Sequence, residues 1–301
     1  MIRSELLFLY DIENNNPNGD PLDSNKPRTD EATGYNIVTD VRLKRTIRDY
    51  LMNYKAYNGA SGKDAKDIFV RTIADENGII QDGKGRALNF KNDAESILKR
   101  CIDIRLFGGV IPLDNDSITY TGPVQFKMGR SLNRVEILYI KGTGAFASKK
   151  DAKQQTFREE YILPYSLICF YGIINENTAI HTTLTDDDVD LMIEAMWDGT
   201  KALNTRTKIG QNPQLLLKIN YKEPNFHIGE IDKYISIDKS IDDLKIRNIE
   251  EVTINLNRLK EVLVKYKDKI ENVEFKCGER IKLSLEKIET LFPKMSQLSW
   301  K

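Results

Sequence analysis

The sequence predicts an α+β fold in which a ferredoxin-like core carries long insertions. Three observations predict it: an apolar strand near residues 5–12, amphipathic helices over 40–54 and from 185 onward, and apolar strand segments between and after them. The order strand, helix, strands, helix, strand matches the β-α-β-β-α-β pattern, which the RRM fold shares. We expect residues 1–230 to form this core and residues 231–301 to form a mixed, partly helical extension packed on it.

The segment after the first strand is rich in Asn, Gly, Pro and Asp up to about residue 37. We expect an irregular loop of about 25 residues there, a length that usually indicates function or disorder. A helix is predicted from Thr39 and Asp40 to Tyr54, because apolar residues recur along one of its faces. These residues are Leu43, Ile47, Tyr50, Leu51 and Tyr54.

Further along the chain, glycines and aspartates punctuate residues 58–87. A second helix is predicted over 92–106, with Gly108 and Gly109 as its stop signal. Strands are predicted near 68–70 and over 117–128, 135–140, 161–174 (broken by Pro164) and 214–221. Residues 142–160 are polar, basic and poor in aliphatic side chains, so we expect an exposed insertion there.

A third helix along the chain is predicted to start at Thr185. Asp188 follows three residues later and gives a pair that resembles a capping box. The predicted apolar face of this helix includes Val189, Met192 and Met196. Residues 255–270 and 281–292 are also predicted to be helical.

The composition argues against several classes of protein. The cysteines Cys101, Cys169 and Cys277 are far apart, which argues against a disulfide framework or a thiolate zinc site and fits a reducing cytoplasm. Two isolated histidines, His181 and His227, argue against an imidazole-based triad or zinc centre. No run approaches the roughly 18 apolar residues of a membrane helix. We therefore expect a cytoplasmic protein with no metal, no cofactor and no membrane partner.

Charge is balanced over the whole chain but segregated along it. The sequence holds 45 basic and 45 acidic residues. Residues 125–158 carry eight basic and two acidic side chains, a net charge of +6, and residues 201–222 carry five basic side chains and no acid. This distribution is what a focused anion-binding surface requires.

Basic side chains gather on the helix predicted first. Lys44 and Arg48 are four residues apart and share one face, with Arg45 beside them and Arg42 at the flank. Cations in the first turns oppose the helix dipole, at a cost of roughly 0.3–1 kcal/mol each when exposed. A phosphate bound at the free amides of this end would offset that cost. The alternative is a solvated face whose cations pair with its own aspartates.

Two loops add donors and cations to the same surface. The loop before the helix contributes Asn18, Gly19, Lys26 and Arg28. Asn and Gly adopt left-handed conformations that expose backbone donors to phosphates. The loop over 204–213 contains Arg206 and Lys208 and no acid; the alternative here is a loop that only improves solubility.

The insertion at 142–160 is open to more than one interpretation. Residues 142–147 fit the pattern G-x-G-x-x-A, but a dinucleotide site needs an amphipathic helix next, and the residues that follow are nearly all polar. The segment is better interpreted as a clamp, a subunit contact or a disordered stretch. In a clamp, Phe146 would stack on a base, with Lys149 and Lys150 beside it.

Several blocks of residues resemble the signature of the CRISPR-associated Cas-seven family of the RAMP superfamily. They are Asn16-Pro17-Asn18-Gly19-Asp20-Pro21, Pro27-Arg28-Thr29-Asp30 and Val38-Thr39-Asp40-Val41-Arg42-Leu43-Lys44-Arg45-Thr46-Ile47-Arg48. The resemblance continues through 107–109, 120–126, 130–131 and 204–208, and so covers roughly residues 6–230. It is closest to the Csh-two branch of type I-B, with the Csd-two branch of type I-C a near neighbour.

The resemblance implies a Cascade backbone subunit with an RRM-like palm and a thumb-like hairpin at about 142–160. Copies of such a protein polymerise along the spacer of a CRISPR RNA and, with other Cascade subunits, present its bases to invading DNA. The implied RNA-binding residues are Asn18, Gly19, Lys26, Arg28, Lys44, Arg45, Arg48, Arg130, Arg206 and Lys208, with Phe146, Lys149 and Lys150 in the thumb.

On this interpretation the protein is not an enzyme and has no catalytic residue. The alternative is a metal-dependent endonuclease for target RNA. Related RAMP subunits of type III complexes cut RNA with a loop aspartate, and Asp20, Asp23 and Asp30 lie in the corresponding long loop.

Overall fold

A computed structural model describes residues 1–60, 65–74, 77–113, 117–147 and 155–300, and for 143–147 and 155–158 the backbone alone. The helices are α1 (Asp40–Tyr54), α2 (Gly83–Leu88), α3 (Ala94–Arg100), α4 (Ile102–Phe107), α5 (Glu176–Thr182), α6 (Asp186–Lys201) and α7 (Asn257–Lys265). Short 3-10 helices are η1 (Ile231–Tyr234), η2 (Asp243–Lys245), η3 (Ile249–Glu251) and η4 (Ile288–Leu291). No helix in the described part of the chain is long and apolar enough to cross a membrane.

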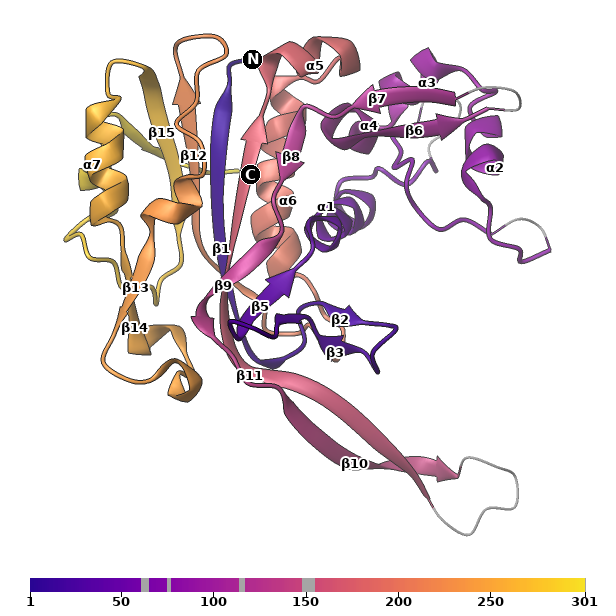
Figure 1. The fold of residues 1–301 in the computed structure, drawn as a ribbon. Coiled ribbons are helices and arrows are strands. Elements are labelled where there is room, and N and C mark those ends of the chain that lie inside the picture. The colour runs from indigo at the N-terminus through magenta and orange to yellow at the C-terminus, as the bar shows by residue number, and fades with distance from the viewer. Residues whose placement is uncertain (61–64, 75–76, 114–116, 148–154, 301) are drawn as a thin grey trace.

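One large sheet organises the molecule (Figure 1). Its strands are β1 (Ser4–Asn15), β4 (Thr29–Asp30), β5 (Tyr35–Val38), β8 (Val124–Phe126), β9 (Gly129–Arg134), β10 (Leu138–Ala147), β11 (Gln155–Ile174), β12 (Asn212–Tyr221), β15 (Ile270–Cys277) and β16 (Met295–Gln297). Their order is β16-β15-β12-β1-β11-β9-β5-β4, with β8 and β10 also paired to β11. Separate two-stranded ladders join β2 (Gly19–Asp20) to β3 (Lys26–Pro27), β6 (Gly108–Pro112) to β7 (Ser117–Thr121), and β13 (Ser236–Lys239) to β14 (Val252–Asn255).

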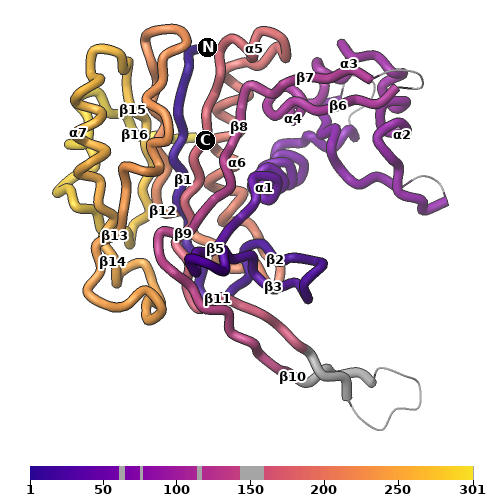
Figure 2. Tube along the Cα trace, in the orientation of Figure 1, coloured from indigo at the N-terminus to yellow at the C-terminus, as the bar shows by residue number. Residues whose placement is uncertain are grey.

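The first strand lies in the middle of this sheet (Figures 1 and 2). Ser4 pairs with Ile174 of β11 on one side and with Asn220 of β12 on the other, both antiparallel. Phe8 belongs to one hydrophobic core and Leu9 to another, so alternate residues of β1 are buried on opposite faces of the sheet. Burial on both faces explains why β1 is a continuous apolar run rather than an alternating one.

Helices α1 and α6 cover one face of the sheet. The apolar residues Leu43, Ile47 and Leu51 of α1 are buried in this core, as predicted, whereas Tyr54 is exposed. The predicted start of α6 is confirmed: Thr185 and Asp188 form a capping box, with bonds of 3.2 Å in both directions. The elements β1, α1, β9, β11, α6 and β12 therefore follow one another in the order β-α-β-β-α-β.

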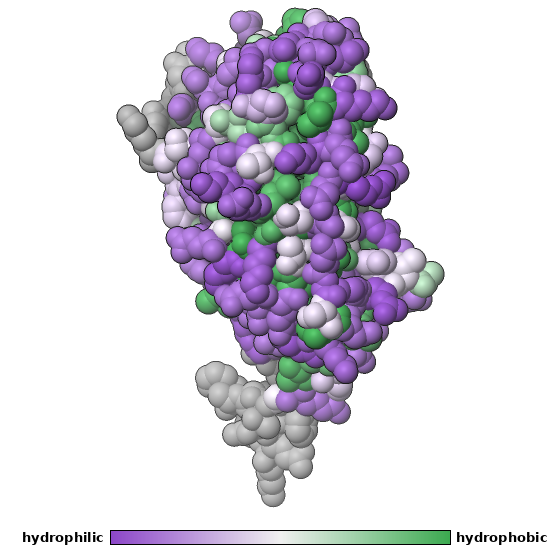
Figure 3. Space-filling view, turned by 90° about the vertical axis from the view of Figure 1, so that its left-hand side faces the viewer, coloured by the Kyte–Doolittle hydropathy of each residue, from purple (hydrophilic) through white to green (hydrophobic). Residues whose placement is uncertain are grey.

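The C-terminal residues cover the opposite face, where a second core forms around Leu217, Leu259 and Phe275. Figure 3 shows the outer surface on this side as largely hydrophilic, with apolar groups in a narrow band. The predicted helix over 255–270 is shorter than expected, and β15 follows it and extends the main sheet beside β12. The predicted helix over 281–292 is wrong except for η4. The chain there is extended beside β14, where the backbone N–H of Ser284 donates to the Ile254 carbonyl at 2.9 Å.

Four other expectations about local structure need correction. The loop over 13–37 contains the short strands β2 to β5. The helix over 92–106 is two helices, because Cys101 is extended where Asp67 pairs with it across a parallel bridge. The strand expected over 135–140 begins only at residue 138, and near 68–70 the structure shows a single bridge, at Asp67.

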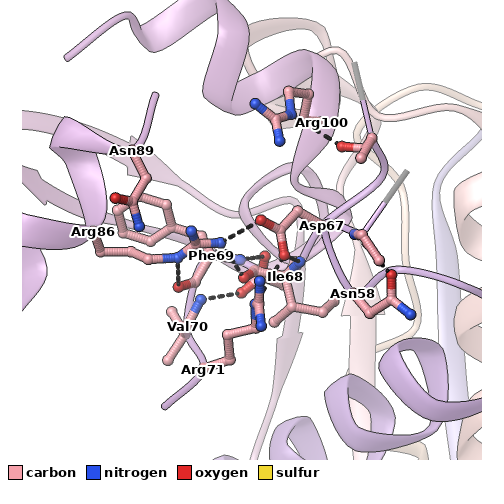
Figure 4. A network of polar contacts seen from close by, with 12 residues as sticks. Asn58, Asp67, Ile68, Phe69, Val70, Arg71, Arg86, Asn89 and Arg100 are labelled. Atoms are coloured by element: carbon pink, nitrogen blue, oxygen red, sulfur yellow. Dashed lines mark hydrogen bonds and ion pairs between the residues drawn. The ribbon is translucent and has the colours of Figure 1, made fainter. Parts of the chain in front are cut away.

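The chain between α1 and β8 forms a lobe that holds α2, α3, α4, β6 and β7 around its own small core (Figure 1). Figure 4 shows the polar contacts that fix it. Asp67 accepts from Arg86 at 2.6 Å and from Arg71 at 2.9 Å, and Arg86 also donates to the Phe69 carbonyl at 3.1 Å. These arginines are therefore internal ties of the lobe.

Strands β10 and β11 leave the sheet together as a projecting arm (Figure 1). β11 continues for 20 residues through Pro164, where a break was expected. Pro164 has no N–H to donate, and it lies opposite Asn14, which has a φ of 48° and is skipped in the β1 pairing. The irregularity in β1 accommodates the proline, so β11 runs from the core into the arm without interruption.

Candidate nucleic-acid interface

Segments far apart in the sequence meet beside the base of the arm. The backbone N–H of Asn16 donates to the Thr207 carbonyl at 3.2 Å, and the Asn15 amide donates to the Ile209 carbonyl at 2.5 Å. The turn after α6 is thereby fixed against the chain that leaves β1. Figure 1 shows β2, β3 and the start of α1 next to this point.

Asn18, Gly19 and Arg28 shape this surface through contacts within the protein. The Asn18 Oδ1 accepts from the backbone N–H of Thr39 at 2.8 Å and from its hydroxyl at 2.9 Å, so Asn18 ties the loop to the start of α1. A side chain at Gly19 would lie 2.2 Å from the Asn25 Oδ1, which leaves room for glycine only. Arg28 donates to the Asn18 and Gly19 carbonyls and lies 3.6 Å from Asp20.

Lys44 and Arg48 face a different side of α1, toward α4. Lys44 is 9% exposed, and its Nζ lies 3.0 Å from Asp40 and 3.3 Å from the Gln125 amide oxygen. Arg48 bonds the fully buried Asp103 at 2.9 Å. Both cations also lie over the Phe107 ring. They are therefore apart from the loop residues with which they were grouped.

Four predicted cations form ion pairs at the surface. Arg45 pairs with Asp49 at 2.7 Å, Lys26 with Asp23 at 2.8 Å, Arg130 with Asp30 at 2.8 Å, and Arg206 with Glu160 at 2.5 Å. Lys26 and Arg206 lie near the base of the arm, where Lys26 sits over the Tyr161 ring and Arg206 pairs with Glu160 of β11. Arg130 lies further along the sheet, opposite Cys169 of β11. Exposed pairs of this kind contribute only about 0–1 kcal/mol, so their cations can exchange a carboxylate for a phosphate at little cost.

Lys208 differs from these four cations. Its Nζ donates to the carbonyls of Asn16 at 2.9 Å and Pro17 at 3.1 Å. Burial and, to a smaller extent, the charge of Arg42 together lower the pKa of Lys208 to about 8. Arg42 donates to the Thr46 hydroxyl at 2.9 Å. Among the described residues, neither cation has a carboxylate within 4.0 Å.

The sequence predicted Arg42 only at the flank of the basic face of α1. The helical period separates it from Lys44 and Arg48 and groups it with Arg45, three residues further on. A hollow of about 360 Å³ opens on this side of α1, lined by Arg45, Asn204 and Thr205 among others. A helical wheel drawn from the sequence would have found this grouping, but not the position of Lys208 beside it.

The arm carries the predicted thumb residues. Phe146 lies in β10, where the structure describes the backbone alone, and Lys149 and Lys150 lie outside the described residues. In the described part, the Tyr139 and Tyr161 rings lie 5.0 Å apart, and Tyr139 is 44% exposed. The arm therefore presents aromatic side chains next to the cations at its base.

The three loop aspartates proposed for an endonuclease each lie beside a cation. Asp20 is near Arg28, Asp23 pairs with Lys26, and Asp30 pairs with Arg130. In the part of the chain that the structure describes, no three His, Cys, Asp or Glu side chains come close enough to hold a metal ion.

Comparisons with known proteins agree with one another. Residues 2–257 match the family model described as CRISPR-associated protein Cas7. A Haloferax volcanii protein, CRISPR-associated protein Cas7, is 31% identical over 315 aligned positions, which cover 94% of this chain and 89% of that protein.

Two solved chains are similar in fold. One, from a "CRISPR RNA-guided surveillance complex, pre-nicking", aligns with a TM-score of 0.58 at 11% identity and covers 99% of this chain and 96% of that one. The other, from a "CRISPR RNA-guided surveillance complex", aligns with a TM-score of 0.57 at 12% identity and covers 98% and 94%. At these identities the likeness concerns the fold.

Proposed function

Because the chain belongs to the CRISPR-associated Cas7 family, we propose that it is a non-catalytic, RNA-binding backbone subunit of a type I Cascade complex. Copies line up along the spacer of a CRISPR RNA, hold its backbone and leave its bases free to pair with invading DNA. Other Cascade subunits complete the assembly. The signature blocks in the first 48 residues favour the type I-B branch.

The observation that carries this proposal is the cluster of exchangeable and unpaired cations at the base of the arm. Arg206 is about half exposed in its side chain and pairs with Glu160 of β11, Lys26 lies over the Tyr161 ring next along that strand, and Lys208 lies in the same turn as Arg206. Contacts of this kind bind phosphates without reading sequence. The β-α-β-β-α-β order supports the RRM-like palm on which these residues would lie.

Salt dependence tests the proposal. We expect the purified chain to bind single-stranded RNA of unrelated sequences with similar affinity, measured by fluorescence anisotropy. If three phosphates are neutralised, affinity falls roughly tenfold to twentyfold between about 50 and 200 mM salt. R206Q should weaken binding to all sequences and reduce the slope by about 0.7.

R258Q is the matched control, because Arg258 lies on α7, on the opposite face of the sheet. It should bind like the unaltered chain. A loss of affinity confined to one RNA sequence, or an equal loss in R258Q, would contradict the proposed surface.

A further inference from the structure

Three consecutive asparagines lie at the end of β1, and each has a separate place in the structure. Asn14 has a φ of 48°, a left-handed conformation that asparagine adopts more readily than most residues, and it lies opposite Pro164 of β11. Asn15 and Asn16 follow this kink, and both are buried. Their amide groups therefore act inside the protein.

Asn16 joins the loop after β1 to the arm. Its Nδ2 donates to the Asn25 carbonyl at 2.6 Å and to the Tyr161 carbonyl at 3.4 Å. Asn25 precedes Lys26 in the chain, and the Lys26 ammonium group lies over the Tyr161 ring, 5.5 Å from its centre. One amide group therefore holds both sides of the contact between Lys26 and Tyr161.

Asn15 holds the turn after α6. Its Nδ2 donates to the Ile209 carbonyl at 2.5 Å, and its Oδ1 accepts from the Asn16 N–H at 2.8 Å. The Asn16 N–H also donates to the Thr207 carbonyl at 3.2 Å. These bonds fix the turn that carries Arg206 against the end of β1.

The amide oxygen of Asn16 has no hydrogen-bond partner among the residues that the structure describes. A buried acceptor without a partner lowers the stability of a fold. Asn16 therefore keeps its two donor bonds at the expense of its acceptor. This is what we expect of a residue that orients its neighbours, because such a residue needs its donors in a fixed direction.

We propose that Asn15 and Asn16 are positioning residues for RNA binding, and that each places a different cation. Asn16 places Lys26 beside the arm, and Asn15 places Arg206 in the turn after α6. Neither asparagine touches the RNA, because both are buried. The inference rests on the proposed function and adds to it the residues that bring its separate segments together.

The proposal predicts a loss of binding without a loss of charge. A cation contributes fully only when it is held where the phosphate will lie, and a cation on a loose segment must be ordered when the RNA binds. Loss of either amide should therefore resemble loss of the cation that it places. Affinity should fall roughly fivefold at about 0.1 M salt, and the salt slope should decrease by about 0.7.

Double-mutant cycles test the proposal, with binding of an oligouridylate measured by fluorescence anisotropy at several salt concentrations. N16A should lower affinity in the unaltered chain and in R206Q, but hardly at all in K26Q, where the cation that Asn16 places is already gone. N15A should show the reverse pattern, with a loss in the unaltered chain and in K26Q but little loss in R206Q.

N220A is the matched control. Asn220 is a buried asparagine of β12 beside the start of β1, where its Oδ1 accepts from the Ser4 hydroxyl at 2.6 Å and its Nδ2 donates to Asn272 at 2.8 Å. N220A should lower the unfolding free energy as N16A does, yet leave RNA affinity and the salt slope unchanged. A purely structural role for Asn15 and Asn16 would make the three variants alike.

N15S and N16S cover the case in which an alanine variant does not fold. Serine leaves a polar group in the buried site, but its shorter side chain does not reach the same carbonyls. The pattern across K26Q and R206Q should be the same as for the alanine variants.

The two proposals can fail separately. If the unaltered chain binds RNA in a salt-dependent way, but N15A and N16A keep its affinity or lower it equally in K26Q and R206Q, the positioning role is overturned and the RNA-binding function stands. If the unaltered chain binds no RNA at low salt, both proposals are overturned.

Discussion

At the scale of single residues, the basic side chains fall into two groups. Arg48, Arg86 and Arg105 each bond a buried aspartate, at distances between 2.6 and 2.9 Å. Within the part of the chain that the structure describes, Lys26 and Arg206 near the base of the arm pair at the surface, and Lys208 bonds two carbonyl oxygens but no carboxylate.

The sequence predicted part of this arrangement. The loop residues Asn18 and Arg28 and the turn residues Arg206 and Lys208 do lie near one another, as the polar, basic composition of their loops indicated. The internal role of Arg48 was not predictable, because Asp103 is 55 residues further along the chain and only the folded lobe brings it close.

The ion pair between Arg48 and Asp103 gives a prediction for stability. R48A leaves Asp103 buried without its cation, although two backbone N–H groups still donate to it. Loss of one partner of a buried pair costs about 3–5 kcal/mol of unfolding free energy. Urea denaturation should show this loss, whereas R45A, at an exposed pair, should change stability by less than about 1 kcal/mol. Equal effects would contradict an internal role for Arg48.

The position of Lys208 gives a prediction for stability against pH. Its folded-state pKa of about 8 lies below its ordinary value of 10.5, so between these values the unfolded chain binds more protons. The unfolding free energy therefore rises with pH between about pH 8 and pH 10.5. Below about pH 8, the full cost of burying the charged ammonium group lowers it. The unfolding free energy of K208M minus that of the unaltered chain should decrease from pH 7 to pH 10. A difference that does not vary with pH would contradict a buried charge at this position.

At the scale of elements, local signals decided which predictions succeeded. α1, α6, β1 and β12 were predicted because their periodicity, capping residues or apolar runs lie within each segment. β15 and the extended chain over 281–285 were missed, because their conformation depends on pairing with β12 and β14. Pairing with a distant strand overrides local helix propensity.

The start of α1 gives a prediction at this scale. Asn18 accepts two hydrogen bonds from Thr39, the residue before the helix, and so acts as a cap supplied from another element. N18A should lower the unfolding free energy by about 1 kcal/mol, as for other lost caps. N18D keeps an acceptor oxygen and should retain most of the stability. If both variants lose the same amount, the cap is not the cause.

At the scale of the whole molecule, the two hydrophobic cores share one sheet. β1 and β11 contribute residues to both cores, and β15 continues the sheet beyond β12. The last residues return to the first core, where the Trp300 indole donates to Asp198 of α6. The division of the chain into residues 1–230 and 231–301 remains a prediction. A cut at that point would separate β15 and Trp300 from the sheet and the core to which they belong.

Truncation tests that boundary. A chain that ends at residue 230 lacks β15 and exposes the apolar face of β12, including Leu217 and Ile219. We expect it to be insoluble or to show no cooperative thermal transition, because half the cover of the sheet is gone. A soluble 1–230 fragment with a sharp unfolding transition would show instead that the first core folds alone.

The central position of β1 has a consequence for protein synthesis. Its partners are residues 163–174 of β11 and 212–220 of β12, so the first strand to leave the ribosome cannot pair on both sides until most of the chain has been made. At about 5–20 residues per second, the intervening stretch of about 200 residues takes roughly 10–40 s to translate. During that time a segment that is apolar on both sides is exposed, which makes the nascent chain a natural client for chaperones. Slow translation should therefore lower the yield of this protein more than that of one whose first strand pairs with its neighbour.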